Sequence, residues 1–343
     1  MQIDSLDIPS LRTYLEAHVA ELGLLRKIEK FPDGQSNPTY LMDTTSGRYV
    51  IRMQPEGKLL KSAHAVDREF RVMQALQHSD VPVPDVLHLC IDLEVIGRKF
   101  FVMRYVAGRV FWHPLTPEVN DTERLQLYSE MNRMLASLHS VDIELAGLSE
   151  FGKPGNYYAR QVSRWSEQYR KTQTRTIKAM DELLDWLPTN IPPDDGQVSL
   201  IHGDYRIDNI LFAQNATTAA ALLDWELSTL GHPYADLAYQ CMQWRLPTDA
   251  VVPGMGEHDR AAMGIPTERE YVERYCKRRG ITDIAHWPFF LAFGFFRFAA
   301  IVQGVQKRAI DGNASSPKAM AYGELVPVLS QLGVGVLADD HSI

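Results

Sequence analysis

The chain has 343 residues, of which 45% are hydrophobic and 23% charged, and it carries a formal net charge of −8. This length and composition are typical of a globular protein with a substantial core, and they exclude extensive disorder. Because the charge is mildly negative and no basic stretch dominates, we expect a protein that does not bind nucleic acid.

The cysteines and the apolar segments indicate in which cellular compartment the protein is expected. Cys90, Cys241 and Cys276 are widely spaced and form no CxxC pair or Cys/His cluster, so neither a disulfide framework nor a zinc site is indicated. The amino-terminal residues lack the basic and apolar regions of an export signal. The most apolar run, residues 289–302, is shorter than a bilayer span and contains Arg297, which favours a buried helix. We therefore expect a cytoplasmic protein with no membrane partner.

The first hundred residues change between helical and extended patterns. Leu11, Leu15 and Val19 recur at helical spacing, which predicts a short amphipathic helix over residues 10–23. The following pattern predicts one more helix, over residues 63–77, and five strands, over residues 27–31, 39–42, 48–53, 85–91 and 99–106. Together these elements indicate a small antiparallel sheet with a helix inserted after its third strand.

Beyond a short connector at residues 105–108 the pattern is mostly helical. The apolar spacing predicts helices over residues 121–139, 157–187 and 267–279. Thr267 and Glu270 form a capping box at the start of the last of these helices. Two short β-like runs interrupt the helical pattern, at residues 198–201 and 220–223.

Three polar side chains lie near these two runs and can carry chemistry. Asp204 follows Gly203, which permits a tight turn, and Asn209 and Asp224 come five and twenty positions later. A hairpin that pairs the two runs would bring the three side chains to one end. Mg²⁺ prefers oxygen ligands of this kind, and a carboxylate can take the proton of an attacking hydroxyl. The arrangement therefore suits phosphoryl transfer.

The residues around these side chains resemble a known family. The strings HGDYRIDN, LLDWE and PYADLA, at residues 202–209, 222–226 and 233–238, are similar to those of the aminoglycoside phosphotransferase and choline kinase superfamily. The likeness spans residues 25–310 and is closest to the branch that also occurs as the kinase-like domain fused to acyl-CoA dehydrogenases. The resemblance implies an α+β, two-lobed protein-kinase-like fold, with a nucleotide-binding lobe at residues 1–106 and a helical lobe at residues 107–343.

Roles follow from the resemblance by position. It implies that Asp204 is the catalytic base and that Asn209 and Asp224 are magnesium ligands. Asp236 would be a structural acid that holds the catalytic loop, and His202 would support that loop through hydrogen bonds. Each residue read alone could be an ordinary turn or cap residue, whereas their joint order and intervals favour the catalytic interpretation.

The residues that bind the nucleotide phosphates are predicted from weaker patterns. The turn before the second strand lacks GxGxxG, yet Gly34, Ser36 and Asn37 can present backbone N–H groups to phosphate oxygens; a plain hairpin turn is the alternative. Arg52 stands where protein kinases carry lysine and would contact phosphate oxygens. Glu69 on the following helix would pair with Arg52, and a solvated helix charge is the competing interpretation.

The connector is expected to bind the purine ring. The backbone of Met103, Tyr105 and Val106 would contact the base, and the side chains there do not distinguish ATP from GTP. Glu226 stands two positions after Asp224 in place of the glycine of protein kinases, which argues against a flipping activation switch. The implied cofactors are Mg²⁺ and ATP, with GTP left open.

The acceptor is expected to be a small molecule bound by the helical lobe. Residues 267–310 carry more basic than acidic side chains, which suits an anionic acceptor better than a polycationic sugar. Our hypothesis is a kinase for a hydroxy acid or a hydroxyacyl thioester. The alternatives are an aminoglycoside O-phosphotransferase of antibiotic resistance, an inactive nucleotide-binding pseudokinase and a protein kinase. Intact Asp204, Asn209 and Asp224 count against the pseudokinase, and the missing GxGxxG against the protein kinase. The oligomeric state is left open.

Overall fold

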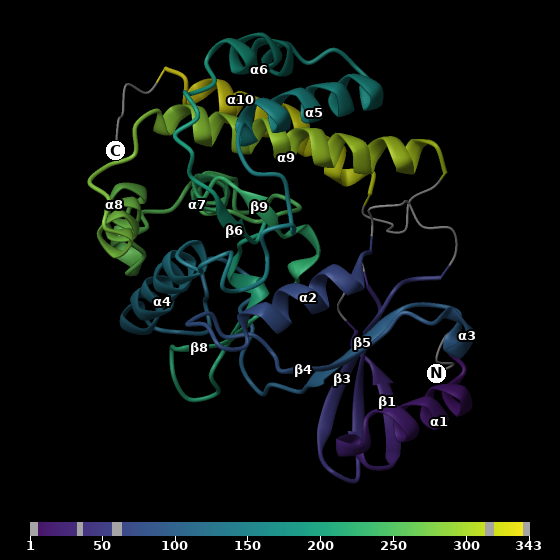
Figure 1. The fold of residues 1–343 in the computed structure, drawn as a ribbon. Helices are drawn as coiled ribbons and strands as arrows, with labels where there is room; N and C mark the ends of the chain where they lie inside the picture. The colour runs from purple at the N-terminus through teal and green to yellow at the C-terminus, as the bar shows by residue number, and fades with distance from the viewer. Residues whose placement is uncertain (1–5, 33–36, 57–63, 313–318, 339–343) are drawn as a thin grey trace. The chain divides into compact units, whose positions relative to one another are not determined.

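The computed structural model describes residues 6–32, 37–56, 64–312 and 319–338, and the chain divides into two compact units (Figure 1). Unit 1 comprises Met1–Arg109, Ala146–Leu148 and Ile210–Ser228. Unit 2 comprises Val110–Leu145, Ser149–Asn209 and Thr229–Ile343. The chain therefore returns twice to unit 1 after Arg109.

Unit 1 is built on a five-stranded antiparallel sheet in the order β1-β2-β3-β5-β4. Its strands are β1 (Leu25–Lys30), β2 (Thr39–Thr44), β3 (Arg48–Met53), β4 (Val86–Cys90) and β5 (Phe100–Arg104). The helices of this part are α1 (Ile8–His18), α2 (Val66–Leu76) and the single turn α3 (Leu93–Ile96). The five predicted strands are confirmed, with ends that differ by a few residues. The sequence pattern missed α3, a turn between β4 and β5.

The alternation of side chains along β3 decides which helix each residue meets. Ile51 is buried in the same core cluster as Leu15 of α1. Successive side chains of a strand point to opposite faces, so Arg52 points to the other face of the sheet. That face is covered by α2, whose Phe70 ring lies 6.1 Å from the ring of Phe101 on β5. The strand pattern thus places Arg52 on the side of α2.

The segment Ile210–Ser228 corrects one prediction. Strand β7 (Ile210–Phe212) pairs antiparallel with β8 (Ala219–Leu222), and the 3-10 turn η3 (Trp225–Leu227) follows. The predicted hairpin between residues 198–201 and 220–223 is therefore wrong. Strand β6 (Ser199–Ile201) pairs instead with β9 (Thr229–Gly231) in unit 2. The β7–β8 pairing closes a much shorter loop than the predicted one, which costs less conformational entropy.

Unit 2 is mainly helical. Its longest helix, α9 (Trp287–Ile310), packs against α5 (Tyr157–Thr172), α6 (Lys178–Thr189), α7 (Tyr234–Trp244) and α10 (Leu325–Gly335). Helices α4 (Asp121–His139) and α8 (Glu268–Arg279) pack against each other, and α8 begins at the predicted capping box. The helix predicted over residues 157–187 is two helices, because the β-branched residues between Thr172 and Ile177 have low helix propensity.

Helix α9 is longer than the apolar run seen in the sequence. It has 24 residues, and by length and composition it could cross a membrane. However, 78% of its most apolar 18-residue window is buried inside the protein. Such burial is expected of a core helix, and Phe295, Phe296 and Ala299 are fully covered by neighbouring helices. The helix therefore forms the centre of the core of unit 2.

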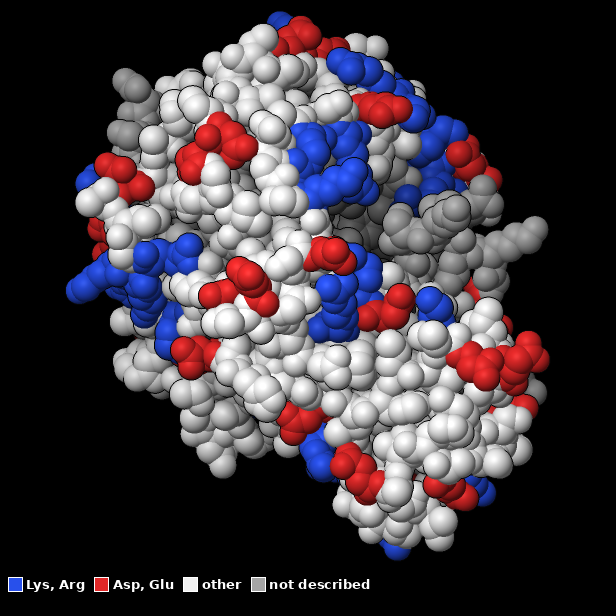
Figure 2. All heavy atoms as spheres, viewed as in Figure 1, with Lys and Arg blue, Asp and Glu red and all other residues white. Residues whose placement is uncertain are grey.

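The surface carries both signs of charge. On the face shown in Figure 2, acidic and basic side chains are intermixed, and large uncharged areas separate them. Within the described residues, no group of three or more His, Cys, Asp or Glu side chains gathers to hold a metal ion, and the three cysteines are buried free thiols.

Candidate active site

Arg52 lies at the centre of a charged cluster in unit 1. Its Nε lies 2.8 Å from Oε2 of Glu69, and its second guanidinium nitrogen lies 2.6 Å from Oδ1 of Asp224. The expected Arg52–Glu69 ion pair is thus present, and the solvated alternative for Glu69 is wrong, since its side chain is only 1% exposed. The geometry follows from the strand and helix, because β3 points Arg52 at α2 and Glu69 lies on the buried face of α2.

Asn37 and Glu226 extend this cluster. The amide nitrogen of Asn37 donates to Glu69 at 2.7 Å and approaches Glu226 at 3.4 Å, and its oxygen lies 3.0 Å from Nδ1 of His64. The buried Asn37 side chain is therefore engaged in holding the cluster. Gly34 and Ser36, predicted to contact phosphates with Asn37, lie outside the described residues.

Several carboxylates gather near Arg52. Its guanidinium pairs with Glu69 and Asp224, and the charge of Glu226 also acts on it. Burial, with the charges of Asp224 and Glu226, raises the pKa of Glu69, while Arg52 opposes the change. Asp224 sits just after β8 in a left-handed backbone conformation with φ of 65°, and its side chain is 35% exposed. A partly exposed carboxylate near other carboxylates can accept a cation.

The connector of unit 1 follows strand β5. Met103 is still part of β5 and is paired with Val50, whereas Tyr105 donates its backbone N–H to Arg48 at 3.3 Å. The ring of Tyr105 lies under the guanidinium of Arg48, 4.3 Å from its carbon. Val106 lies in the irregular segment that follows. Of the three residues predicted to contact the purine, Met103 thus lies near the end of the inner strand β5, and Tyr105 and Val106 follow that strand.

The loop at residues 202–209 of unit 2, which was predicted to be the catalytic loop, is held by a buried carboxylate. Asp236 on α7 is 1% exposed and accepts hydrogen bonds from the backbone N–H groups of His202 at 2.6 Å and Gly203 at 2.8 Å. His139 lies 3.4 Å from the same carboxylate. Burial opposes ionisation, yet the hydrogen bonds and positive groups outweigh it and lower the pKa of Asp236. Gly203 adopts φ of 85°, so the turn before Asp204 requires glycine.

Asp204 follows this turn and is held by two side chains. The hydroxyl of Tyr239 donates to Oδ1 at 2.7 Å. The amide nitrogen of Asn209 donates to Oδ2 at 3.2 Å and to the backbone oxygen of Asp204 at 2.8 Å. The carboxylate remains 24% exposed. Unit 2 thus brings Asp204 and Asn209 together, and His202 supports the loop by accepting the N–H of Asp204 at 3.3 Å.

Two arginines flank the loop. Nε of Arg206 lies 3.8 Å from Oδ1 of Asp204, and its guanidinium also pairs with Asp208. Arg297 on α9 donates to the backbone oxygen of Gly203 at 3.1 Å. Two arginine side chains therefore lie at the loop that carries Asp204, and one of them, Arg206, is shared between Asp204 and Asp208.

Sequence reasoning missed several of these residues. Tyr239 could have been found, because it lies one helical turn after Asp236 and so shares its face of α7. Arg297 appeared only as one of several basic residues, and Glu226 only as a departure from protein kinases. No local pattern connects Arg297 or Glu226 to the residues that they contact.

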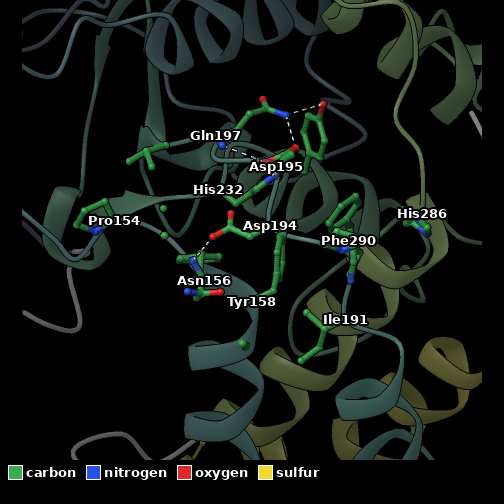
Figure 3. A pocket seen from close by; sticks show the side chains of 18 of the residues that line it. Pro154, Asn156, Tyr158, Ile191, Asp194, Asp195, Gln197, His232, His286 and Phe290 are labelled. Atoms are coloured by element: carbon green, nitrogen blue, oxygen red, sulfur yellow. Dashed lines mark hydrogen bonds and ion pairs between the residues drawn. The ribbon is translucent and has the colours of Figure 1, made fainter.

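A separate cavity of about 390 Å³ lies in unit 2 (Figure 3). It adjoins Gly231, which pairs with Ser199, whereas the catalytic loop follows Ile201 at the other end of β6. Asp194 and Asp195 at its wall accept hydrogen bonds from backbone N–H groups, at 2.6 Å from Asn156 and 3.0 Å from Gln197. None of the predicted site residues lines this cavity. Its aspartates hold the start of α5 and the loop before β6.

A model of the phosphotransferase enzyme family, APH, matches residues 27–274. The chain belongs to this family. It is a phosphotransferase that acts on hydroxyl groups, and its fold is the two-lobed α+β fold of these kinase-like enzymes. Both statements agree with the resemblance seen in the catalytic strings.

Individual relatives agree with this assignment. Acyl-CoA dehydrogenase family member 10 of Mus musculus is 44% identical over 304 residues, which is 88% of this chain and 28% of that protein. The chain spans 28% to 43% of the length of the curated relatives it matches. A solved structure from Ralstonia eutropha JMP134, named as a candidate aminoglycoside phosphotransferase, is 42% identical, with a TM-score of 0.89 over 97% of this chain and 99% of that one.

A more distant structure shares the fold alone. It is an aminoglycoside phosphotransferase in complex with AMP-PNP and hygromycin B, 14% identical to this phosphotransferase, with a TM-score of 0.62 over 96% of this chain and 99% of that one.

Proposed function

We propose that this phosphotransferase moves the γ-phosphoryl group of ATP onto a hydroxyl of a small anionic metabolite, a hydroxy acid or its hydroxyacyl thioester. The observation that carries the proposal is the Asp204 carboxylate, which is held by Tyr239 and Asn209 on a loop fixed by the buried Asp236. A carboxylate so fixed and still partly exposed is suited to act on a substrate hydroxyl.

The proposed step is an in-line displacement at phosphorus. Asp204 accepts the proton of the acceptor hydroxyl, while the oxygen of that hydroxyl forms a bond to the γ-phosphorus. The bond between that phosphorus and the bridging oxygen breaks, and ADP leaves with the electron pair. Orientation of the hydroxyl by a fixed base accounts for much of the acceleration expected in such a transfer.

Asp224 and Asn209 are proposed to hold Mg²⁺. Each residue by itself has the chemistry of a ligand for such an ion. In unit 1 the Asp224 carboxylate is 35% exposed, and in unit 2 Asn209 donates its amide nitrogen to Asp204, so that its amide oxygen can act as an acceptor. The ion would neutralise charge on the phosphate oxygens during transfer. Arg52 orients the Asp224 carboxylate through their 2.6 Å contact.

The nucleotide is proposed to be ATP, in keeping with the AMP-PNP complex of the distant fold relative. Arg52 would contact phosphate oxygens and Glu69 would hold its guanidinium in place. The backbone of Gly34, Ser36 and Asn37 would cover the phosphates. The backbone of Met103, Tyr105 and Val106 would bind the purine, a mode that suits GTP as well.

The anionic acceptor is supported by the two arginines of the loop. Arg206 and Arg297 both lie on the side of unit 2 that presents Asp204, and their charges favour a carboxylate or phosphate-bearing substrate over a polycation. The names of the curated relatives, acyl-CoA dehydrogenase family members, point to acyl-CoA chemistry as the source of such an acceptor.

An aminoglycoside acceptor is the second candidate, because the structure that is 42% identical is described as an aminoglycoside phosphotransferase. Against it, a polycationic sugar would have to approach Asp204 past the charge of Arg206.

Transfer from γ-labelled ATP tests both candidates. The purified chain would be given Mg²⁺ and positional isomers of hydroxybutyrate, the matching hydroxybutyryl-CoA compounds and kanamycin, each in a parallel reaction. We expect label in the hydroxy acids or thioesters and little in kanamycin. Efficient phosphorylation of kanamycin with none of the others would refute the proposed acceptor. Nucleotide binding without transfer to any acceptor would instead indicate a pseudokinase.

A further inference from the structure

Tyr239 is tied to the reacting carboxylate more closely than any other side chain. Its hydroxyl donates to Oδ1 of Asp204 at 2.7 Å, and the residue is only 5% exposed. Its ring is fixed on two sides by α9. The guanidinium carbon of Arg297 lies 5.6 Å from the ring centroid, and the ring of Phe298 meets it edge-on at 6.1 Å. The hydroxyl therefore has little freedom to leave the carboxylate.

The direction of this hydrogen bond is set by the surroundings. Burial and the negative charge of Asp204 raise the pKa of the Tyr239 phenol, so that it keeps its proton at neutral pH. A protonated phenol beside a carboxylate is the donor, and Asp204 is the acceptor. The bond is charge-assisted and correspondingly strong.

The two oxygens of Asp204 are held unequally. Oδ1 accepts the short bond from Tyr239, whereas Oδ2 receives only the 3.2 Å contact from Asn209. Each carboxylate oxygen has two lone pairs, so Oδ2 can accept a further hydrogen bond from a substrate. Without Tyr239, the carboxylate could rotate about its last torsion, which is broad and has no strong preference.

We infer that Tyr239 is a positioning residue for phosphoryl transfer, which fixes the Asp204 carboxylate so that Oδ2 faces the acceptor hydroxyl. The inference rests on the proposed role of Asp204 as the base. The residue does not touch the substrate and donates no proton to it. Its contribution is to keep the base in a reactive orientation, which affects turnover and leaves substrate binding unchanged.

The test compares two tyrosines that each lose one hydroxyl. Tyr271 is fully buried in the same unit, and its hydroxyl donates to the side-chain oxygen of Gln240 at 2.7 Å. Tyr239→Phe and Tyr271→Phe therefore remove the same atom and one buried hydrogen bond each. With labelled ATP and hydroxybutyryl-CoA, we expect Tyr239→Phe to lower kcat about 10- to 100-fold, with both KM values within about twofold of the parent. Tyr271→Phe should keep the kcat of the parent while its thermal midpoint falls.

A double-mutant cycle separates positioning from general support of the fold. If Tyr239 acts through Asp204, adding Tyr239→Phe to Asp204→Ala should not lower the single-turnover rate of phosphoryl transfer any further. Additive losses in the double variant, or a kcat for Tyr239→Phe equal to that of the parent, would overturn the inference. These outcomes differ from failure of the proposed function, in which the parent chain transfers no label or Asp204→Ala keeps full turnover.

Discussion

Substitution of Asp236 by asparagine is expected to destabilise unit 2 markedly. The buried carboxylate accepts two backbone N–H groups, of His202 at 2.6 Å and Gly203 at 2.8 Å. Asparagine keeps one acceptor oxygen but turns the other into an amino group that faces an N–H donor. The lost hydrogen bond to a charged group contributes about 1.5–3 kcal/mol, and an unsatisfied buried donor costs a further 1–3 kcal/mol or so. Part of this loss is offset, because asparagine carries no charge that has to be desolvated. We therefore expect the free energy of unfolding to fall by about 2–4 kcal/mol.

Urea unfolding followed by far-ultraviolet circular dichroism measures this change. Asp259→Asn is the matched control, since the exposed Asp259 carboxylate accepts one backbone N–H, that of Ala262 at 3.2 Å, in the same unit. The control midpoint should stay close to that of the parent. An Asp236→Asn midpoint no lower than that of the control would refute the assignment of Asp236 as the support of the catalytic loop.

Two further predictions concern the other buried charges. Arg52→Met leaves the Glu69 carboxylate buried without its cation, so it should lower the free energy of unfolding by about 3–5 kcal/mol. The double variant Arg52→Met/Glu69→Gln should recover part of this loss. Urea unfolding midpoints measure both changes. The pKa of His139 is lowered because burial disfavours its cation, in spite of the nearby Asp236, so its contribution to stability is fully present above pH 6.5 and is lost as the pH falls towards the folded-state pKa. Below pH 6.5, His139→Gln should therefore weaken the dependence of stability on pH by up to about 1.4 kcal/mol per pH unit, measured by urea unfolding between pH 7.5 and 5 or so.

Each of these has a clear contrary result. An Arg52→Met chain as stable as the parent would mean that Glu69 does not need its cation in the fold. A pH dependence that is unchanged by His139→Gln would mean that this imidazole titrates alike in the folded and unfolded states.

The local patterns predicted most of the secondary structure of unit 1. The extended pattern of residues 48–53 predicted β3 with the bounds found in the structure, and the position of Arg52 on this strand led to the prediction of its pair with Glu69. The hairpin error has a physical origin. Two apolar runs can each pair with any nearby strand, and periodicity does not show that residues 210–212 form a closer partner for residues 219–222.

The candidate site was predictable only in part. The order and spacing of Asp204, Asn209 and Asp224 predict their catalytic roles through the family resemblance, and these roles remain proposals. Tyr239 comes from a helix that begins far along the chain, and its contact with Asp204 depends on how α7 packs behind the loop. Arg297 is one arginine in an apolar helix, and the pattern of that helix is typical of a core element. Such tertiary contacts leave no periodic signal in the sequence.

The most direct test of the assigned roles is a comparison of Asp204→Ala with Asp224→Ala, by γ-phosphoryl transfer and by Mg²⁺-ATP binding in titration calorimetry. We predict that Asp204→Ala loses about 10²–10⁴ in turnover and binds Mg²⁺-ATP nearly as the parent does. Asp224→Ala should lose both turnover and Mg²⁺-ATP affinity, because it removes a proposed ligand of the ion. Full turnover by Asp204→Ala, or equal loss of Mg²⁺-ATP affinity in both variants, would contradict a base at 204 and a metal ligand at 224.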